Sequence, residues 1–302
     1  MTTSTAVVSV RDLVKSFGAT RAVRGVSLDI PAGSVFGLVG ENGAGKSTLA
    51  KLMSGIESPD SGTLSLNGRM VALRDPHEGI KAGISMMAQE IMLVPDATVE
   101  ENVFLGSLPR RGPFPDAKAM RRRFSDLVEL TEFDLDPTAK VATLRIADQQ
   151  KVEILRALSQ DADIIVMDEP SAALTKDEVQ RLHQSIREIA RRGSAVLLIS
   201  HFLEEVIALT DQVAIMRDGE LVRVGPTAGE TVDSLVASMV GRALDTDYHT
   251  AKPQATGPTR MSVSHLTRAG VLDDVNFEIR EGEILGLAGL IGSGRTEIAR
   301  CI

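Results

Sequence analysis

One short glycine-rich stretch restricts the possible folds more than any other feature of this sequence. The run Gly40-Glu-Asn-Gly-Ala-Gly-Lys-Ser47 follows the apolar stretch Val35 to Val39 and precedes a helical pattern from Thr48 to Met53. The spacing G-x-x-x-x-G-K-S/T between a strand and a helix is typical of a loop that wraps phosphate groups. Its glycines let successive backbone N–H groups turn inward, and the helix N-terminus adds its dipole. The sequence therefore predicts an α/β domain with a phosphate-binding loop.

The residues of this loop have distinct expected roles. Lys46 is expected to place its charge against the β- and γ-phosphates of a nucleotide, and the Ser47 hydroxyl is expected to bind Mg²⁺. The residues predicted to cradle the phosphates are Gly40, Glu41, Asn42, Gly43, Ala44, Gly45, Lys46, Ser47 and Thr48. The loop alone thus predicts binding of a nucleotide together with Mg²⁺.

Two acidic residues follow a second apolar strand, Ile164 to Met167. A strand that simply reaches solvent at its end would show the same pattern. Beside a phosphate loop, however, the pair predicts chemistry: Asp168 would hold the metal through water, and Glu169 would polarise the attacking water. A third apolar run, Ala195 to Ile199, alternates with helical patterns, and this alternation favours a parallel sheet covered by helices.

An internal repeat indicates parts of two similar domains. The stretch from Val26 to Ser47 recurs at constant spacing as Val275 to Thr296. The second copy begins near Met261 and stops within the helix expected after its own glycine loop, so we expect this sequence to be a piece of a longer tandem protein. The expected organisation is a first domain over residues 7–241 with a helical insertion at about 99–157, a linker over 242–260, and the start of a second domain over 261–302.

Composition and charge exclude several classes of protein. The 302 residues include 33 Lys and Arg, 41 Asp and Glu and a single cysteine, and the net charge is −8. An acidic balance argues against a broad nucleic-acid-binding surface, and one cysteine allows no internal disulfide. No apolar run approaches the roughly 20 residues of a membrane-spanning helix, and no secretory signal is visible. We therefore expect a cytoplasmic protein.

Further motifs appear in the order found in the ATP-binding cassette (ABC) family, which the sequence resembles from about Val7 to Gly241. The resemblance makes Gln89 the glutamine that joins the Mg²⁺ shell and the contact to a membrane partner. It makes His201 the histidine that reaches the γ-phosphate, and Phe17 the aromatic residue that stacks on adenine. Taken alone, His201 would be an ordinary histidine, either on the surface or with its hydrogen bonds satisfied, and Phe17 would be an ordinary core or surface phenylalanine.

The resemblance also implies a fold, cofactors and partners. The fold is that of a P-loop NTPase of the ABC type: a mainly parallel sheet, an antiparallel β subdomain and an inserted helical subdomain. The duplication, the run Ser171 to Leu174 and the form of the second glycine loop resemble tandem ATPases that power bacterial import of monosaccharides such as ribose, xylose and galactose. This implies ATP and Mg²⁺, transmembrane permease subunits, an indirect periplasmic or extracellular sugar-binding protein, and a second ABC domain in the same chain. The expected place is the cytoplasmic face of the membrane, peripherally bound.

Two departures from the family pattern are expected to fall on one site. The family signature L-S-G-G-Q is represented by Leu144 to Gln150, with Arg145 in the serine position and an unusual Asp148. In the second copy, Arg295 replaces the phosphate-loop lysine. In ABC dimers each site pairs the phosphate loop of one domain with the signature of the other. The resemblance therefore implies one degenerate site, built on Arg295, and one competent site, built on Lys46.

Two other functions are compatible with part of the pattern. A soluble tandem cassette protein acting on ribosomes or nucleic acid shares the motif order, but the short linker and the acidic balance argue against it. A nucleotide-binding pseudoenzyme is disfavoured by the intact Lys46, Asp168 and Glu169. The sequence does not indicate which sugar would be carried.

Overall fold

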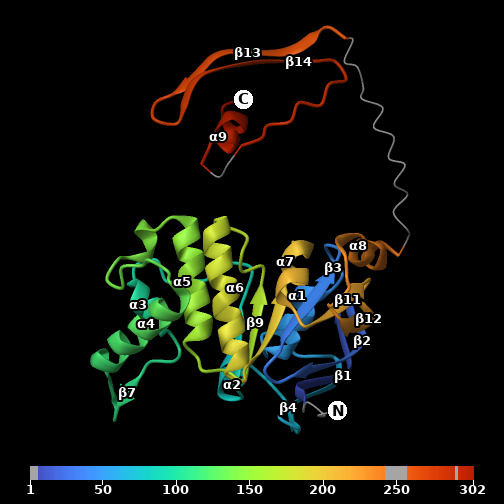
Figure 1. Cartoon of the computed structure of the whole chain (residues 1–302), viewed down its shortest axis with the longest axis vertical. Coiled ribbons are helices and arrows are strands. Elements are labelled where there is room, and N and C mark those ends of the chain that lie inside the picture. Colours follow the sequence, from blue (N-terminus) through green and yellow to red (C-terminus); the bar gives the residue numbers. More distant parts are fainter. Residues whose placement is uncertain (1–5, 242–256, 290–291) are drawn as a thin grey trace. The chain divides into compact units, whose positions relative to one another are not determined.

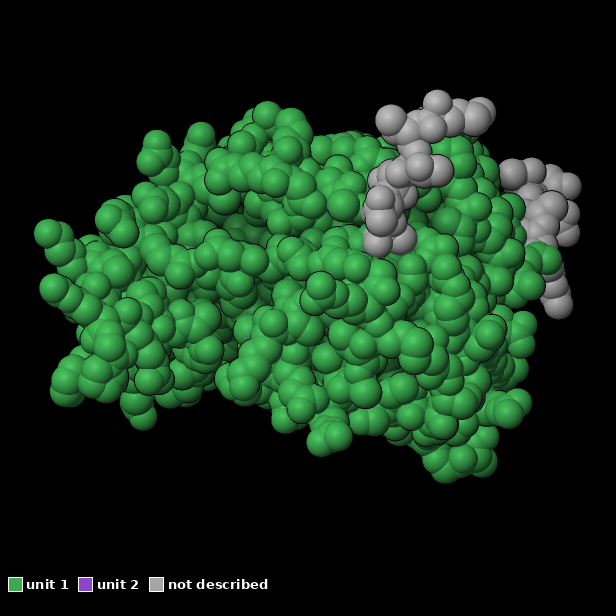
Figure 2. Space-filling view, turned by 90° about the horizontal axis from the view of Figure 1, so that it is seen from below, with its two compact units in different colours: residues 1–244 green, residues 245–302 purple. Residues whose placement is uncertain are grey.

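The structure is a computed structural model that describes residues 6–241, 257–289 and 292–302. Its contacts divide the chain into a first unit, Met1–Leu244, and a second unit, Asp245–Ile302, and each is treated by itself. Figure 2 shows one face of the first unit in green. Most of the predicted linker, residues 242–256, lies outside the described residues. The domain boundaries therefore stay predictions.

A six-stranded sheet with the order β12-β11-β3-β10-β9-β6 forms the centre of the first unit (Figure 1). All neighbours are parallel except β11 and β12, which form an antiparallel hairpin. Strands β3, β9 and β10 are buried along their whole length, as expected for parallel strands covered on both faces. This confirms the three predicted strands. The strands are β3 (Val35–Gly40), β6 (Ile84–Met87), β9 (Ile164–Asp168), β10 (Ala195–Ile199), β11 (Gln212–Arg217) and β12 (Glu220–Pro226).

The two faces of this sheet pack into different cores. Successive side chains of a strand point to opposite faces. Leu197 and Ile199 of β10 therefore join a core shared with helix α1 (Lys46–Met53) and the antiparallel strands, whereas Val196 and Leu198 join a core shared with the helices of the other face. Burial on both sides fixes the register of the strands, and with it the position of the loops that follow them.

A separate four-stranded antiparallel sheet, in the order β2-β1-β4-β5, packs against the first of these cores. Its long hairpin pairs Val10 with Leu28 and ends where Phe17 pairs with Thr20. A mixed central sheet with an antiparallel β subdomain confirms the predicted fold class. The strands are β1 (Ala6–Phe17), β2 (Thr20–Pro31), β4 (Ser61–Leu66) and β5 (Arg69–Val71).

The stretch 99–157, predicted to be helix-rich, contains α3, α4 and α5, which Figure 1 shows grouped together beside α6. Helix α6 begins and ends as predicted: the Glu178 carboxylate accepts hydrogen bonds from the N–H and the hydroxyl of Thr175 (2.8 and 2.9 Å), a capping box. The remaining helices of the first unit are α2 (Pro76–Lys81), α3 (Val99–Val103), α4 (Ala117–Thr131), α5 (Ile146–Leu158), α6 (Lys176–Arg191), α7 (Leu203–Leu209) and α8 (Val232–Val240). No helix of the described residues combines the length and the apolar composition needed to cross a membrane.

The described residues of the second unit form one antiparallel hairpin and one helix. Strands β13 (Thr259–Arg268) and β14 (Leu272–Arg280) pair with each other, and α9 spans Arg295–Cys301. The described residues between them form no strand, although they correspond in the repeat to β3, and Ile284 is 90% exposed. Strand β3 is held between β10 and β11. The second unit has no such neighbours among its described residues, so an apolar segment alone does not become a sheet strand there.

Candidate active site

Four loops of the first unit meet at one edge of the central sheet. They follow β3, β6, β9 and β10, whose carboxyl ends lie at the same edge because the strands are parallel. Together with the hairpin ends of the antiparallel strands they enclose a pocket of about 830 Å³. Its lining consists of Thr20, Arg21, Ala22, Arg24, Asn42, Gly43, Gly45, Lys46, Ser47, Thr48, Gln89, Asp168, Glu169, His201 and Asp218. Most residues predicted from separate motifs thus line one cavity.

The phosphate loop needs glycine at two positions for different reasons. The backbone of Gly40 is not in the left-handed conformation, but a Cβ at this position would lie 2.3 Å from the carbonyl oxygen of Met216. Gly45 has φ +96°, a left-handed conformation that costs other residues free energy, and its Cβ would lie 2.2 Å from the carbonyl oxygen of Ala22. The phosphate loop therefore packs closely against β2 and β11, and its backbone forms part of the pocket wall.

The Lys46 ammonium lies inside the loop. Its Nζ donates to the carbonyl oxygens of Gly40 and Glu41 (2.9 and 3.0 Å). Burial lowers the pKa of Lys46, and the nearby carboxylates of Asp168 and Glu169 offset only part of this effect. A group held in this way gains from a polyanion, since phosphate oxygens would supply the charge that the carbonyls lack.

The residues predicted to bind the metal fit Mg²⁺ when phosphate oxygens complete its shell. Asp168 is 2% exposed. Burial raises the pKa of its carboxyl, and a hydrogen bond from the Ser47 hydroxyl, which lowers the pKa, offsets only part of this effect. No group of three or more His, Cys, Asp or Glu side chains that could hold a metal ion occurs among the described residues. A set of one hydroxyl, one carboxylate and the amide of Gln89 suits an ion that is usually bound by one or two carboxylates plus substrate phosphates.

Glu169 is held in a strained backbone conformation at the centre of the pocket. Its φ is +55°, and its N–H donates to the carbonyl of Ile199 in the adjacent strand (2.8 Å). Its two carboxylate oxygens face different partners: His201 Nδ1 lies 3.1 Å from Oε1, and Gln89 Nε2 donates to Oε2 at 3.4 Å. Strain of this kind persists only where the surrounding structure imposes it, and it is common at catalytic sites.

Three predicted residues besides Gly40 do not line the pocket. Phe17 is 47% exposed, with Lys15 Nζ 5.3 Å from the centre of its ring. Its strand partner Thr20 does line the pocket, so Phe17 lies at the edge of the site. Glu41 contributes its backbone carbonyl, and Ala44 is buried. A stacking role for Phe17 therefore stays a prediction.

The pocket also contains charged residues that the sequence analysis missed. Arg21 and Arg24 come from β2, and Asp218 comes from the turn between β11 and β12. The two hairpins are joined because Arg24 N–H donates to the carbonyl of Gly219 (2.8 Å). Two arginines that follow the predicted adenine-stacking residue Phe17 on the next strand were the available signal, since cations beside a phosphate loop favour a polyanion.

The signature segment lies outside this pocket. Arg145 is the N-cap of α5, and its side chain, 84% exposed, pairs with Asp148 at 3.2 Å. Asp148 also pairs with Lys151 (2.8 Å), which reaches Glu178 on α6 (2.6 Å). In the second unit Arg295 begins α9 after Gly294, and Leu290 and Ile291 of that glycine loop lie outside the described residues.

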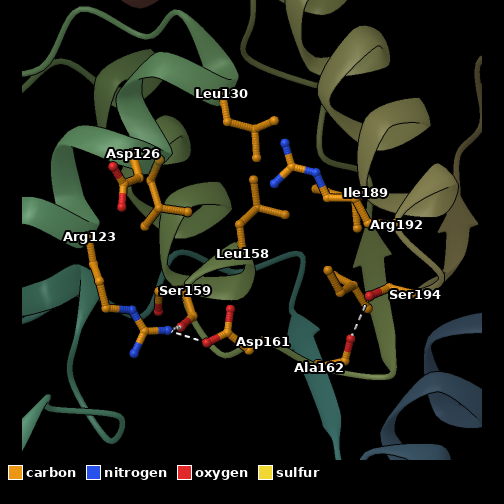
Figure 3. A pocket seen from close by; sticks show the side chains of 12 residues that line it. Arg123, Asp126, Leu130, Leu158, Ser159, Asp161, Ala162, Ile189, Arg192 and Ser194 are labelled. Carbon is orange, nitrogen blue, oxygen red and sulfur yellow. Dashed lines mark hydrogen bonds and ion pairs between the residues drawn. The ribbon is translucent and has the colours of Figure 1, made fainter.

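A second pocket of about 390 Å³ lies between α4, α5 and α6 and contains none of the predicted site residues (Figure 3). Figure 3 shows leucine and isoleucine side chains at its centre and the ion pair of Arg123 with Asp161 at one rim. Ile165, near the start of β9, lines this pocket, whereas Asp168 at the end of that strand lines the first. The predicted phosphate-binding and catalytic residues are therefore confined to the first pocket and its edge.

Comparisons with solved structures support the assignment of the fold. A nucleotide-free ATP-binding cassette from an ABC transporter superposes with a TM-score of 0.67 at 25% identity, over 78% of this chain and 95% of that one. The ADP conformation of another cassette of an ABC transporter also gives 0.67 at 25% identity, over 78% and 97%. Residues 23–172 match the family described as ABC transporter. The first unit has the fold of an ATP-binding cassette.

Curated relatives extend over both units. The chain is 48% identical to a ribose import ATP-binding protein of Streptomyces avermitilis, over 98% of the chain and 59% of that protein. It is 45% identical to a ribose import ATP-binding protein of Rhodococcus jostii, over 97% of the chain and 58% of that protein. The chain thus spans less than two thirds of the length of the relatives that it matches.

Proposed function

We propose that this chain is the ATP-hydrolysing subunit of an importer for ribose or a similar monosaccharide. The observation that carries the proposal is the cassette pocket, where Lys46, Asp168, Glu169 and His201 from three different loops line one cavity. The names of the relatives, ribose import ATP-binding proteins, support the substrate class.

In the proposed reaction, the γ-phosphoryl group of ATP passes to water and yields ADP and inorganic phosphate. Lys46 Nζ exchanges the carbonyls of Gly40 and Glu41 for oxygens of the β- and γ-phosphates. Ser47 and Asp168, with Gln89, are the residues that would hold Mg²⁺. The ion, when bound, neutralises charge on the phosphates.

Glu169 is the proposed base for the attacking water. Its carboxylate lies between His201 and Gln89, which orient both oxygens and leave the strained backbone little freedom. A carboxylate held in this way polarises a water that approaches the γ-phosphate in line, and His201 contacts the γ-phosphate itself.

The proposed partners are transmembrane permease subunits, an indirectly coupled sugar-binding protein, and a second cassette that begins at residues 261–302 of the same chain. The protein would bind peripherally to the cytoplasmic face of the membrane. The site that pairs Arg295 with the segment Leu144 to Gln150 would be degenerate. The site built on Lys46 would hydrolyse ATP.

Calorimetric titration with MgATP tests the nucleotide part of this proposal. Lys46→Ala should weaken binding by at least about 100-fold, because a charge-assisted hydrogen bond contributes about 1.5–3 kcal/mol and Lys46 would make more than one. Lys51→Ala is the matched control, a cation on the same helix that does not line the pocket. An affinity of Lys46→Ala within about twofold of the parent would refute the proposal.

The substrate class requires a second measurement. In membranes that contain the permease and the sugar-binding protein, ribose should raise the ATPase rate of the parent and leave that of Glu169→Gln near zero. A rate that responds to no monosaccharide would contradict the importer part while leaving the ATPase part intact.

A further inference from the structure

A buried carboxylate on α7 has no role in the reaction described above. Glu205 lies one helical turn after His201 and is 7% exposed. One of its oxygens, Oε2, accepts hydrogen bonds from the hydroxyls of Ser171 (2.9 Å) and Ser200 (2.7 Å). The other, Oε1, accepts from His183 Nε2 on α6 at 2.9 Å. An ionised carboxylate with both oxygens satisfied is one of the few stable ways to bury this side chain.

The two serine partners of Glu205 belong to the two segments that carry the reacting side chains. Ser171 follows Glu169 by two residues, and Ser200 directly precedes His201. The Ser200 hydroxyl also accepts from the N–H of Phe202 at 3.1 Å, so it fixes the backbone on both sides of His201. Glu169 and His201 are therefore joined twice: directly at 3.1 Å, and behind the pocket through one carboxylate oxygen.

The charge state of Glu205 suits this arrangement. Burial raises the pKa of its carboxyl, but the hydrogen bonds from His183, Ser200 and Ser171 more than offset burial and leave the pKa below its usual value. An ionised carboxylate accepts from all three groups at once, whereas a protonated one would have a donor on one oxygen and would require one of the three groups to accept instead. The anion thus keeps both serine hydroxyls on a single atom.

We propose that Glu205 is a positioning residue that holds the segment after Glu169 and the segment before His201 in one fixed relation, through Ser171 and Ser200. It contacts no reacting atom. This inference rests on the proposed ATPase function, because the relation matters only if Glu169 and His201 act together. His183 supports it from α6 by satisfying the other oxygen of Glu205.

Steady-state ATPase rates and calorimetric MgATP binding of the whole protein test this role. Glu205→Ala should lower kcat about tenfold and leave KM and the MgATP Kd within about twofold, because the phosphate loop does not contact Glu205. Glu205→Gln should keep kcat within about threefold, since its amide oxygen can accept both hydroxyls and its amide nitrogen can donate to neutral His183. An equal loss in the two variants, or parental kcat in Glu205→Ala, would overturn the proposal.

A double-mutant cycle separates positioning from general stability. Ser171→Ala and Ser200→Ala should each lower kcat about threefold in the parent and have no further effect in the Glu205→Ala background, because their common partner is already absent. If the losses in kcat caused by Ser171→Ala, Ser200→Ala and Glu205→Ala simply multiply when the substitutions are combined, the proposal is overturned. A second readout is the imidazole NMR signal of His201, which should shift in Glu205→Ala and stay near its parental position in Glu205→Gln. A His201 signal that is unmoved in Glu205→Ala would also count against it.

Thr210→Ala is the matched control for a lost buried contact near α7. Its hydroxyl bonds to that of Thr227 at 2.8 Å, away from both loops. This variant should lower the unfolding temperature and keep kcat. Lys46→Ala separates the two proposals. Turnover that survives this substitution refutes the assignment of ATP hydrolysis to the pocket of Lys46, whereas turnover that falls with Lys46→Ala but not with Glu205→Ala refutes only the role of Glu205.

Discussion

His201 Nδ1 lies 3.1 Å from Oε1 of Glu169, although the two residues follow different strands and are separated by the whole of α6. Strands β9 and β10 are parallel neighbours in which Asp168 pairs with Ile199, so Glu169, the first residue after β9, and His201, the second residue after β10, leave the sheet side by side. The contact is therefore a product of strand register. It places an imidazole and a carboxylate in the pocket that Lys46 also lines.

Glu169→Gln should separate binding from turnover. The amide can still orient a water but cannot take its proton, and loss of a general base typically costs 10²- to 10⁴-fold in rate. We expect kcat to fall by at least about 100-fold while calorimetric MgATP affinity stays within about threefold. Glu204→Gln, an exposed carboxylate on α7, is the control and should keep the parental rate. Hydrolysis by Glu169→Gln at the parental rate would exclude Glu169 as the base.

Gly45→Ala should damage the phosphate loop more than it damages the fold. The new Cβ would lie 2.2 Å from the Ala22 carbonyl at φ +96°, so the loop must move away from β2. We expect MgATP affinity to fall more than tenfold, with about 1–3 kcal/mol of strain in the free energy of unfolding. Gly193→Ala is matched in conformation, with φ +110° and no atom within 4 Å of its Cβ. It should lose stability but keep its affinity for nucleotide.

Glu178 should give the cassette a stability that depends on pH. Burial raises the pKa of its carboxyl, but hydrogen bonds from Lys151 and Thr175 outweigh burial and lower the pKa to about 2, from 4.5. A pKa that is lower in the folded state stabilises the fold above about pH 4.5, and this contribution disappears as the pH falls toward 2. Glu178→Gln should therefore lower the urea-unfolding free energy by about 1.5–3 kcal/mol at pH 7 and by clearly less at pH 3. Equal losses at both pH values would contradict this.

Arg145→Ser should have little effect on turnover while Lys46 is intact. The Arg145 side chain is 84% exposed, lies outside the pocket, and pairs only with Asp148 among the described residues. An exposed ion pair of this kind contributes about 0–1 kcal/mol. We expect the ATPase rate of the whole protein to stay within about twofold and the unfolding free energy to change by less than about 1 kcal/mol. A loss of turnover above tenfold would overturn the assignment of Arg145 to a degenerate site.

Local patterns were enough to predict the parts of this cassette that depend on nearby sequence. The apolar runs of β3, β9 and β10 and the capping box at Thr175 each lie within a few residues, and all are confirmed. The loops after parallel strands could also be expected to meet at one edge, which brings Lys46 and Glu169 together.

Features that depend on tertiary contacts were not visible in the sequence. Arg24 and Asp218 reach the pocket because the β1–β2 and β11–β12 hairpins touch, and no local pattern encodes that contact. His183 and Glu205 lie on different helices and meet only after α6 and α7 have packed. The residues of the second unit that correspond in the repeat to β3 form no strand, since a strand needs neighbours that the repeat alone does not supply among the described residues.

The strand order has a consequence for synthesis of the protein. Strand β3 leads into the phosphate loop, and its neighbours in the sheet of the described residues are β10 and β11, which are both synthesised long after it. At about 5–20 residues per second, the ribosome needs roughly 10–30 s to produce these neighbours. Throughout that interval the phosphate loop has been synthesised, but the strands that pair with β3 and hold the loop in place have not. ATP therefore cannot assist the early steps of folding. The nucleotide site becomes available only when the sheet closes on both sides of β3.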